Sequence, residues 1–245
     1  MLNPYDPADS ANRGVGFFLF EANDWQQEKY TLRASFSMFQ QTAMPEVKAK
    51  KREASDDELQ EPITSEEFLA MGEMDGRYEL VEGQIVEVDK EATMGFPSFR
   101  HGQIEVRLGR HLDEFVQEHA LGHVAGGEVG IYTERDPDTL RGADMVFVSN
   151  ERFGTRSPEA TYLDVAPELI VEIISPSNFW GNMRDKLKEY FDLGTERVWV
   201  VESENEAVLV FRSPTDLTEL EAGDTLDGEG ALDGFSVPIE TLFAA

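Results

Sequence analysis

Hydrophobic and polar positions along the chain become periodic from Thr64 onward. Residues 64–71 predict a short helix, because a Thr-Ser pair at its start is followed by two glutamates in the first turn and then by apolar side chains. Residues 78–81 and 84–88 alternate apolar and polar side chains on either side of a Glu-Gly pair, as the two arms of a hairpin do. The first predicted elements are therefore a helix and two antiparallel strands.

Two longer amphipathic helices follow. Between Pro97 and Leu121, apolar side chains recur at spacings of four, four and three, which is one helical face, and Gly122 is the predicted stop. This face consists of Ile104, Leu108, Leu112 and Phe115. The second helix runs from about residue 182 to residue 193 and ends at Gly194, with Met183, Leu187, Tyr190 and Phe191 on one face.

Apolar runs rich in valine and isoleucine predict five further strands. They cover residues 124–132, 143–148, 169–174, 198–201 and 208–211. The order is then helix, two strands, helix, three strands, helix, two strands, which predicts an α/β or α+β fold with a mixed sheet flanked by helices. The acidic tail from Thr215 to Ala245 closes on an apolar patch whose position the pattern does not give: Phe235, Val237, Ile239, Leu242 and Phe243.

The first 60 residues show no sustained period. We therefore expect residues 1–60 to form a flexible N-terminal extension and residues 61–245 to form one domain. Met38 and Met44 offer alternative translation starts, so the native protein is expected to lack part of residues 1–43 if the coding start is mis-assigned. N-terminal sequencing of the native protein decides this.

The composition excludes several classes of protein. Hydrophobic residues make up 40% of the chain, yet no apolar stretch approaches the about 20 residues of a membrane span. The N-terminus lacks the features of a secretory signal, so we expect a soluble, cytoplasmic protein without a membrane partner. The absence of cysteine rules out disulfides, thiolate nucleophiles and cysteine-bound zinc, so any metal must have oxygen or histidine ligands.

The formal charge of −28 arises from 49 acidic and 21 basic side chains. It favours an acidic surface suited to high salt, where screening acts within about 3 Å at 1 M. An acidic interaction protein and a surface that repels nucleic acid are the alternatives, since phosphate binding needs local cations. The candidate cations are Arg100, Arg107, Arg110, Arg135, Arg141, Arg152, Arg156 and Arg184.

Two carboxylates interrupt predicted core strands. With a period of two, Asp144 shares a face with two valines, and Glu172 lies mid-strand between isoleucines. Burying an unpaired carboxylate costs several kcal/mol, so each group needs a cation. One possibility is an internal salt bridge with Arg141, Arg184 or Lys186, and the other is a metal ion.

Lys186 lies in the helix that follows the Glu172 strand, one step off its apolar face. A lysine there either stays in solvent or leans back toward the sheet. Two carboxylates and a lysine form a device for phosphodiester hydrolysis, because Mg²⁺ takes carboxylate oxygens and activates a water, while the lysine positions that water or neutralises phosphoryl charge.

The combined motifs resemble those of the Uma2 family of restriction-endonuclease-like proteins, in the PD-(D/E)XK nuclease superfamily. A Glu-x-x-Ser-Pro-Ser segment begins at Glu172, Asp-Lys-x-x-x-Tyr follows at residues 185–190, and a strand with Trp199 comes next. Residues 77–85, His101 and residues 143–148 extend the resemblance to about residues 63–201.

The resemblance implies a restriction-endonuclease-like fold and cleavage of DNA that depends on Mg²⁺ or Mn²⁺. It implies metal ligation by Asp144, Glu172 and the main-chain carbonyl of Ile173, with Lys186 as the catalytic lysine supplied from the helix. Glu79, Arg100 and His101 are expected to line the cleft and contact the substrate, although a bridging or solvent-facing Glu79 and a structural His101 are the alternatives. Two departures stand out: Ala143 replaces the proline of the superfamily's Pro-Asp pair, and Ile174 replaces its strand lysine.

Two other functions compete with a nuclease. One is a catalytically silent nuclease fold that acts as a nucleic-acid or protein interaction module. The other is an acidic interaction protein with Asp144 and Glu172 in salt bridges, where Glu172→Gln should cost about 3–5 kcal/mol, whereas at a metal site the same change should cost little or stabilise. Because a DNA duplex is symmetric and two copies can cut its two strands, a homodimer is expected.

Overall fold

The computed structural model describes residues 61–72, 74, 76–88, 97–157, 161–174 and 180–244. For residues 180–182 it describes only the backbone. The extension predicted for residues 1–60 lies outside this part of the chain. No helix of the described part is both long and apolar enough to cross a membrane.

The first elements form as the sequence predicts. Helix α1 (Ser65–Ala70) begins with a capping box, in which the Thr64 side chain accepts a hydrogen bond from the backbone of Glu67 and the Glu67 side chain accepts one from the backbone of Thr64. Strands β1 (Arg77–Val81) and β2 (Gln84–Val88) pair antiparallel. Their two-residue turn has positive φ at Glu82 and Gly83, 50° and 72°, as a type I′ hairpin turn requires.

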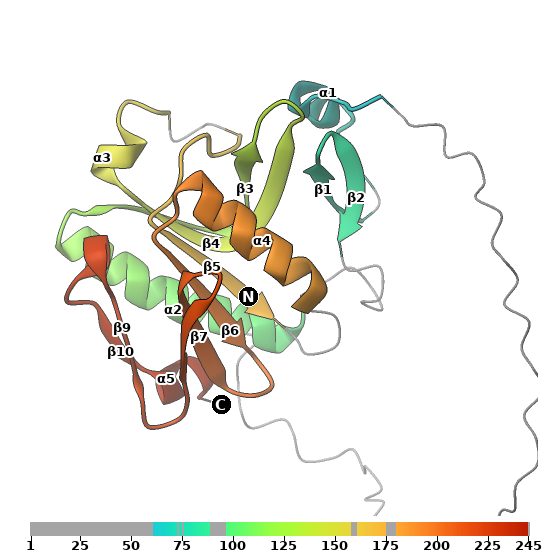
Figure 1. Cartoon of the computed structure of the whole chain (residues 1–245). Coiled ribbons are helices and arrows are strands. Elements are labelled where there is room, and N and C mark those ends of the chain that lie inside the picture. Colours follow the sequence, from blue (N-terminus) through green and yellow to red (C-terminus); the bar gives the residue numbers. More distant parts are fainter. Residues whose placement is uncertain are drawn as a thin grey trace, which may run out of the picture. The chain divides into compact units, whose positions relative to one another are not determined.

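A mixed sheet is the centre of the described domain (Figure 1). Its remaining strands are β3 (Gly122–Glu134), β4 (Thr139–Ser149), β5 (Leu169–Ile174), β6 (Arg197–Glu202), β7 (Ala207–Ser213) and β8 (Asp216–Leu220). The order is β2-β1-β4-β5-β6-β7-β8, and β3 pairs with β4 outside this path. Strands β5 and β6 are parallel and are joined by helix α4 (Trp180–Leu193), whereas the other described pairs are antiparallel. The predicted fold class is confirmed.

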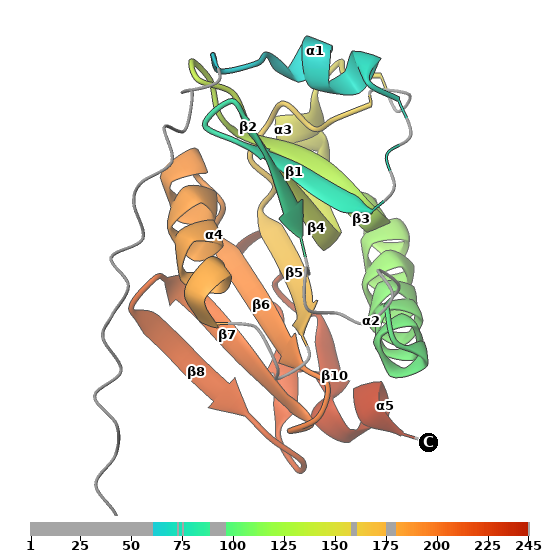
Figure 2. The ribbon, with the colours of Figure 1, turned by 90° about the vertical axis from the view of Figure 1, so that its right-hand side faces the viewer.

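Helices cover both faces of this sheet (Figure 2). The apolar side of α2 (Phe99–Glu118) packs on one face, against Val171 and Ile173 of β5. The other face packs against α4 and includes Ile170 and Ile174 of β5. Because β5 is buried on both faces, it reads in sequence as a continuous apolar run, and Glu172 is its one charged residue.

The acidic tail completes the core on the α2 side. It forms β9 (Thr225–Asp227), a 3-10 turn (Gly230–Leu232), β10 (Ser236–Pro238) and α5 (Ile239–Phe243). All five side chains of its apolar patch are buried in one cluster with Leu108 and Leu112 of α2. Phe235 stacks on Trp199 of β6 with ring centroids 5.8 Å apart.

One predicted helix end was wrong. Helix α2 ends at Glu118, and the left-handed residue after it is Ala120, with a φ of 50°, and not Gly122. Gly122 is the first residue of β3, where a Cβ atom would lie 2.1 Å from the carbonyl oxygen of Val148. The glycine is therefore required by close strand packing, which local sequence cannot distinguish from a helix stop.

Candidate active site

Asp144 and Glu172 lie on neighbouring strands, at the point where β4 and β5 separate. The last registered pair of these strands is Met145 with Val171, and the next pair in this register would be Asp144 with Glu172. The backbone pairing of β4 with β5 stops there, and a side-chain contact takes its place: Oδ2 of Asp144 accepts a hydrogen bond of 2.6 Å from the amide of Ile173. The carbonyl of a strand residue points to the same side as its amide, so the Ile173 carbonyl also faces β4.

Glu172 is held by two side chains of α4. Its Oε1 accepts a hydrogen bond of 2.7 Å from the hydroxyl of Tyr190 and one of 3.3 Å from Nζ of Lys186. Burial raises the pKa of Glu172 to about 7. The positive charge of Lys186 lowers this pKa, and the negative charge of Asp144 raises it, but burial has the largest effect. The described residues donate no hydrogen bond to its Oε2, so this oxygen remains available to a cation.

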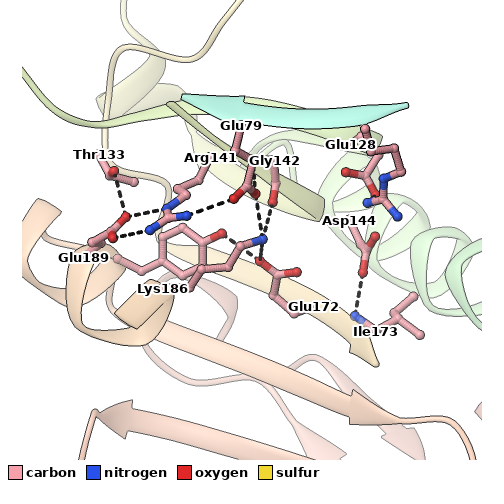
Figure 3. Close-up of polar contacts among 12 residues, drawn as sticks. Glu79, Glu128, Thr133, Arg141, Gly142, Asp144, Glu172, Ile173, Lys186 and Glu189 are labelled. Carbon is pink, nitrogen blue, oxygen red and sulfur yellow. Dashed lines mark hydrogen bonds and ion pairs between the residues drawn. The ribbon is translucent and has the colours of Figure 1, made fainter. Parts of the chain in front are cut away.

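Lys186 is shared between two buried carboxylates. Its Nζ lies 2.9 Å from Oε1 of Glu79 and donates a hydrogen bond of 2.9 Å to the carbonyl of Gly142 (Figure 3). Burial alone would lower the pKa of Lys186, but the charges of Glu172 and Glu79 outweigh it and raise the pKa, so the ammonium group stays charged. Lys186 contacts two carboxylates, so its positive charge is well stabilised. Glu172 shares this one cation with Glu79, and its pKa therefore stays raised.

Glu79 bridges the hairpin to the centre of the sheet. It is only 7% exposed, and it accepts hydrogen bonds from Arg141 (2.9 Å) and from the amide of Gly142 (3.1 Å) in addition to its contact with Lys186. Burial would raise the pKa of Glu79, but Lys186 and Arg141 together lower it. Glu79 is thus buried in the structure and contacts both Arg141 and Lys186.

Arg141 ties this bridge to α4. Its Nε donates a hydrogen bond of 2.7 Å to Glu189, which also accepts one of 3.2 Å from Thr133. Because Arg141 contacts Glu79 and Glu189 at once, it links β1, β4 and α4 around Lys186 (Figure 3).

His101 joins the site and Arg100 does not. Nε2 of His101 is 3.3 Å from Oδ1 of Asp144. Burial would raise the pKa of Asp144, but the hydrogen bond and charge of His101 lower this pKa. Burial would lower the pKa of His101, but the hydrogen bond and charge of Asp144 raise it. Arg100 instead donates a hydrogen bond of 2.8 Å to the carbonyl of Ser203 and pairs with Glu206, in the turn between β6 and β7.

Two residues of the site were not singled out for it from the sequence. Tyr190 was interpreted as a core residue; it is fully buried, but its hydroxyl binds Glu172. Its position four residues after Lys186, on the same side of α4, was a usable signal. Burial raises the pKa of Glu128 of β3, with a contribution from the charge of Asp144, and Glu128 pairs with Arg77. The Gly-Gly pair just before Glu128 was the available signal, because glycine inside a strand marks a bulge.

The donor chemistry of this site fits a hard divalent cation. The site contains four carboxylates, those of Glu79, Glu128, Asp144 and Glu172. Lys186 contacts Glu79 and Glu172, and His101 contacts Asp144. Two arginines complete the set, Arg141 with Glu79 and Arg77 with Glu128. Oxygen ligands with uncompensated negative charge are what Mg²⁺ and Mn²⁺ take. Among the described residues, no three His, Asp or Glu side chains already converge on one ion position, so binding requires these side chains to move.

The pKa of Glu172 gives a testable dependence of stability on pH. A carboxyl whose pKa rises from 4.5 to about 7 on folding contributes stability that is fully present below pH 4.5 and is lost as the pH rises through about 7. Metal-free wild type should therefore lose about 3 kcal/mol relative to Glu172→Gln across this window, since one pKa unit is worth about 1.4 kcal/mol. Urea unfolding in EDTA between about pH 4 and pH 8 measures it. The exposed Asp192→Asn is the control, and a constant loss of about 3–5 kcal/mol in Glu172→Gln would instead indicate a salt bridge.

The other predicted cations are largely engaged within the protein. Arg152 contacts Glu168 and Glu196, Arg156 contacts Asp164, and Arg107 donates to the carbonyl of Leu242. Arg110 and Arg184 are exposed, and no ion pair with either is found within the described residues.

Comparisons with known proteins agree with this architecture. The Uma2 family model, described as "Putative restriction endonuclease", matches residues 65–240. The search among curated proteins found no match. Among solved structures, the chain is similar to a crystal structure of "a putative nuclease belonging to DUF820" from Anabaena variabilis ATCC 29413, at 20% sequence identity over 75% of this chain and 98% of that chain, with a TM-score of 0.63. This likeness shows a restriction-endonuclease-like fold, and because the family model spans most of the sequence, the chain belongs to the Uma2 family.

Proposed function

We propose that this protein is an endonuclease that hydrolyses DNA phosphodiester bonds with Mg²⁺ or Mn²⁺. The observation that carries the proposal is the approach of Lys186 to within 3.3 Å of Glu172, next to Asp144, where the pairing of β4 with β5 stops. Asp144, Glu172 and the carbonyl of Ile173 would hold the ion. The metal would supply an activated water and stabilise the phosphoryl oxygens.

The surrounding residues have separate tasks in this proposal. Lys186 is held by Glu79 and by the carbonyl of Gly142, so its charge is fixed beside Glu172, where it can neutralise a phosphoryl oxygen or orient a water. Tyr190 fixes the rotamer of Glu172 through its hydroxyl. His101, with Nε2 3.3 Å from Oδ1 of Asp144, orients this carboxylate at the edge of the site.

A second candidate is a catalytically silent nuclease fold that binds nucleic acid or protein. The ion pairs that occupy the carboxylates favour it, because a metal must displace them or share their oxygens.

Metal titration separates the two candidates. Mg²⁺ and Mn²⁺ are titrated by calorimetry into wild type, Asp144→Ala and Glu172→Ala at low and high salt, and plasmid nicking is assayed on the same samples. The expected result is metal binding in wild type and, in both variants, a loss of binding together with a loss of nicking of at least about 100-fold. Asp192→Ala, which removes an exposed acid of α4, should behave as wild type. Wild-type protein that binds no metal at any salt would support the silent fold.

A further inference from the structure

Strand β3 is irregular directly opposite Asp144. Its register with β4 pairs Gly126 with Met145 and then Val129 with Ala143, so two residues, Gly127 and Glu128, face the single residue Asp144. Both adopt left-handed backbone conformations, with φ of 84° and 65°. This is a β-bulge, a feature that redirects a side chain and is common next to active sites.

The bulge directs the carboxylate of Glu128 into the site. A Cβ atom on Gly142 would lie 3.0 Å from Oε2 of Glu128, so the carboxylate lies over Gly142, the residue that binds both Lys186 and Glu79. Figure 3 shows the side chains of Glu128 and Asp144 next to each other. A residue larger than glycine at position 142 would crowd this carboxylate.

Backbone preference does not explain a glutamate at position 128. A left-handed conformation costs a residue other than glycine roughly 1–2 kcal/mol, and glycine would avoid that cost. Arg77 pairs with Glu128, but its side chain is 29% exposed and that of Glu128 is 39% exposed. An ion pair this open contributes only about 0–1 kcal/mol, so it does not by itself offset a strained backbone and a neighbouring carboxylate.

We propose that Glu128 supplies a further carboxylate oxygen to the divalent ion held by Asp144 and Glu172, and that Arg77 pairs with Glu128 when the ion is absent. This inference rests on the metal site of the proposed function. Three carboxylates from β3, β4 and β5 would then surround the ion, in keeping with the preference of Mg²⁺ and Mn²⁺ for oxygen ligands. Arg77, whose side chain is 29% exposed, would give up its pair with Glu128 when the ion binds.

Two substitutions test the proposal with effects of opposite sign. Glu128→Gln should weaken Mn²⁺ binding by at least about tenfold, and Arg77→Gln should tighten it, because the competing cation is removed from the ligand. Glu134→Gln makes the same charge change at an exposed position of β3 and should leave the affinity unchanged. Calorimetry measures the affinities, and metal-free thermal melts show that each variant is folded.

Terbium luminescence distinguishes a ligand from a structural residue. The difference between Tb³⁺ lifetimes in H₂O and D₂O counts the waters on the bound ion, and this count should rise by about one in Glu128→Gln and stay constant in Glu134→Gln. If Glu128→Gln binds Mn²⁺ as wild type does while Asp144→Ala does not, the proposal for Glu128 is wrong and the metal site stands. If wild type binds no Mn²⁺, both are wrong. Should Glu128→Gln not fold, an unchanged affinity in Arg77→Gln would overturn the proposal.

Discussion

Replacing Lys186 by methionine is expected to destabilise the metal-free protein by about 3–5 kcal/mol at neutral pH. Methionine keeps most of the side-chain volume, so the loss is electrostatic. Without the ammonium group, Glu172, which is 6% exposed, would have no cation, and Glu79, which is 7% exposed, would keep only Arg141. The carbonyl of Gly142 would lose its hydrogen bond as well.

Denaturant unfolding in EDTA measures this effect, and Lys188→Met is the matched control because it removes the same charge from the exposed side of the same helix. The control should change the free energy of unfolding by no more than about 0.5 kcal/mol. The loss in Lys186→Met should shrink toward acid pH, where Glu172 becomes protonated. Equal stability of the two variants at neutral pH would show that Lys186 is not the buried counter-ion.

Replacing Trp199 by alanine should cost about 3–5 kcal/mol, the range typical of a buried tryptophan. Trp199 is 1% exposed and lies between the sheet and the C-terminal tail, where it stacks on Phe235. Its loss removes contacts from β6, α2 and the tail together, because these elements share one apolar cluster.

Thermal and urea unfolding of Trp199→Ala give this number, and Leu217→Ala on β8, 46% exposed, should change it by less than about 0.5 kcal/mol. A double-mutant cycle with Phe235→Ala should show a coupling of about 0.5–1.5 kcal/mol, which is the contribution of the ring pair. Strict additivity would mean that the tail does not pack on Trp199 as described.

The elements that the sequence predicts well are those whose period is set by burial on one continuous face. The apolar face of α2 and the unbroken apolar run of β5 leave little ambiguity, and an acid inside such a run is conspicuous, which is why Asp144 and Glu172 could be singled out. Lys186 could be placed near them because α4 directly follows β5, so its position depends on a short stretch of chain.

The features that escaped prediction depend on contacts between distant segments. The hydrogen bond of Glu79 with Arg141 spans 62 residues, and no local period reveals it. The position of Glu128 depends on a single bulge, and the position of the tail patch depends on an α2 surface more than a hundred residues earlier in the chain. Gly122 illustrates the same limit, because its function is a close approach to β4.

The hairpin β1–β2 carries Glu79 and Arg77. It is joined to the rest of the sheet by one registered pair, Leu80 with Leu140, by the hydrogen bond from the Gly83 amide to the Asp138 carbonyl, and by the contacts of Glu79. Elements with few such links open locally with a smaller free energy than global unfolding requires. Each opening of the hairpin would withdraw Glu79 from Lys186 and Arg141, so the site would exist only in the closed fraction. Amide hydrogen exchange in β1 would therefore report how often the site is assembled, and any ligand of the assembled site would slow that exchange.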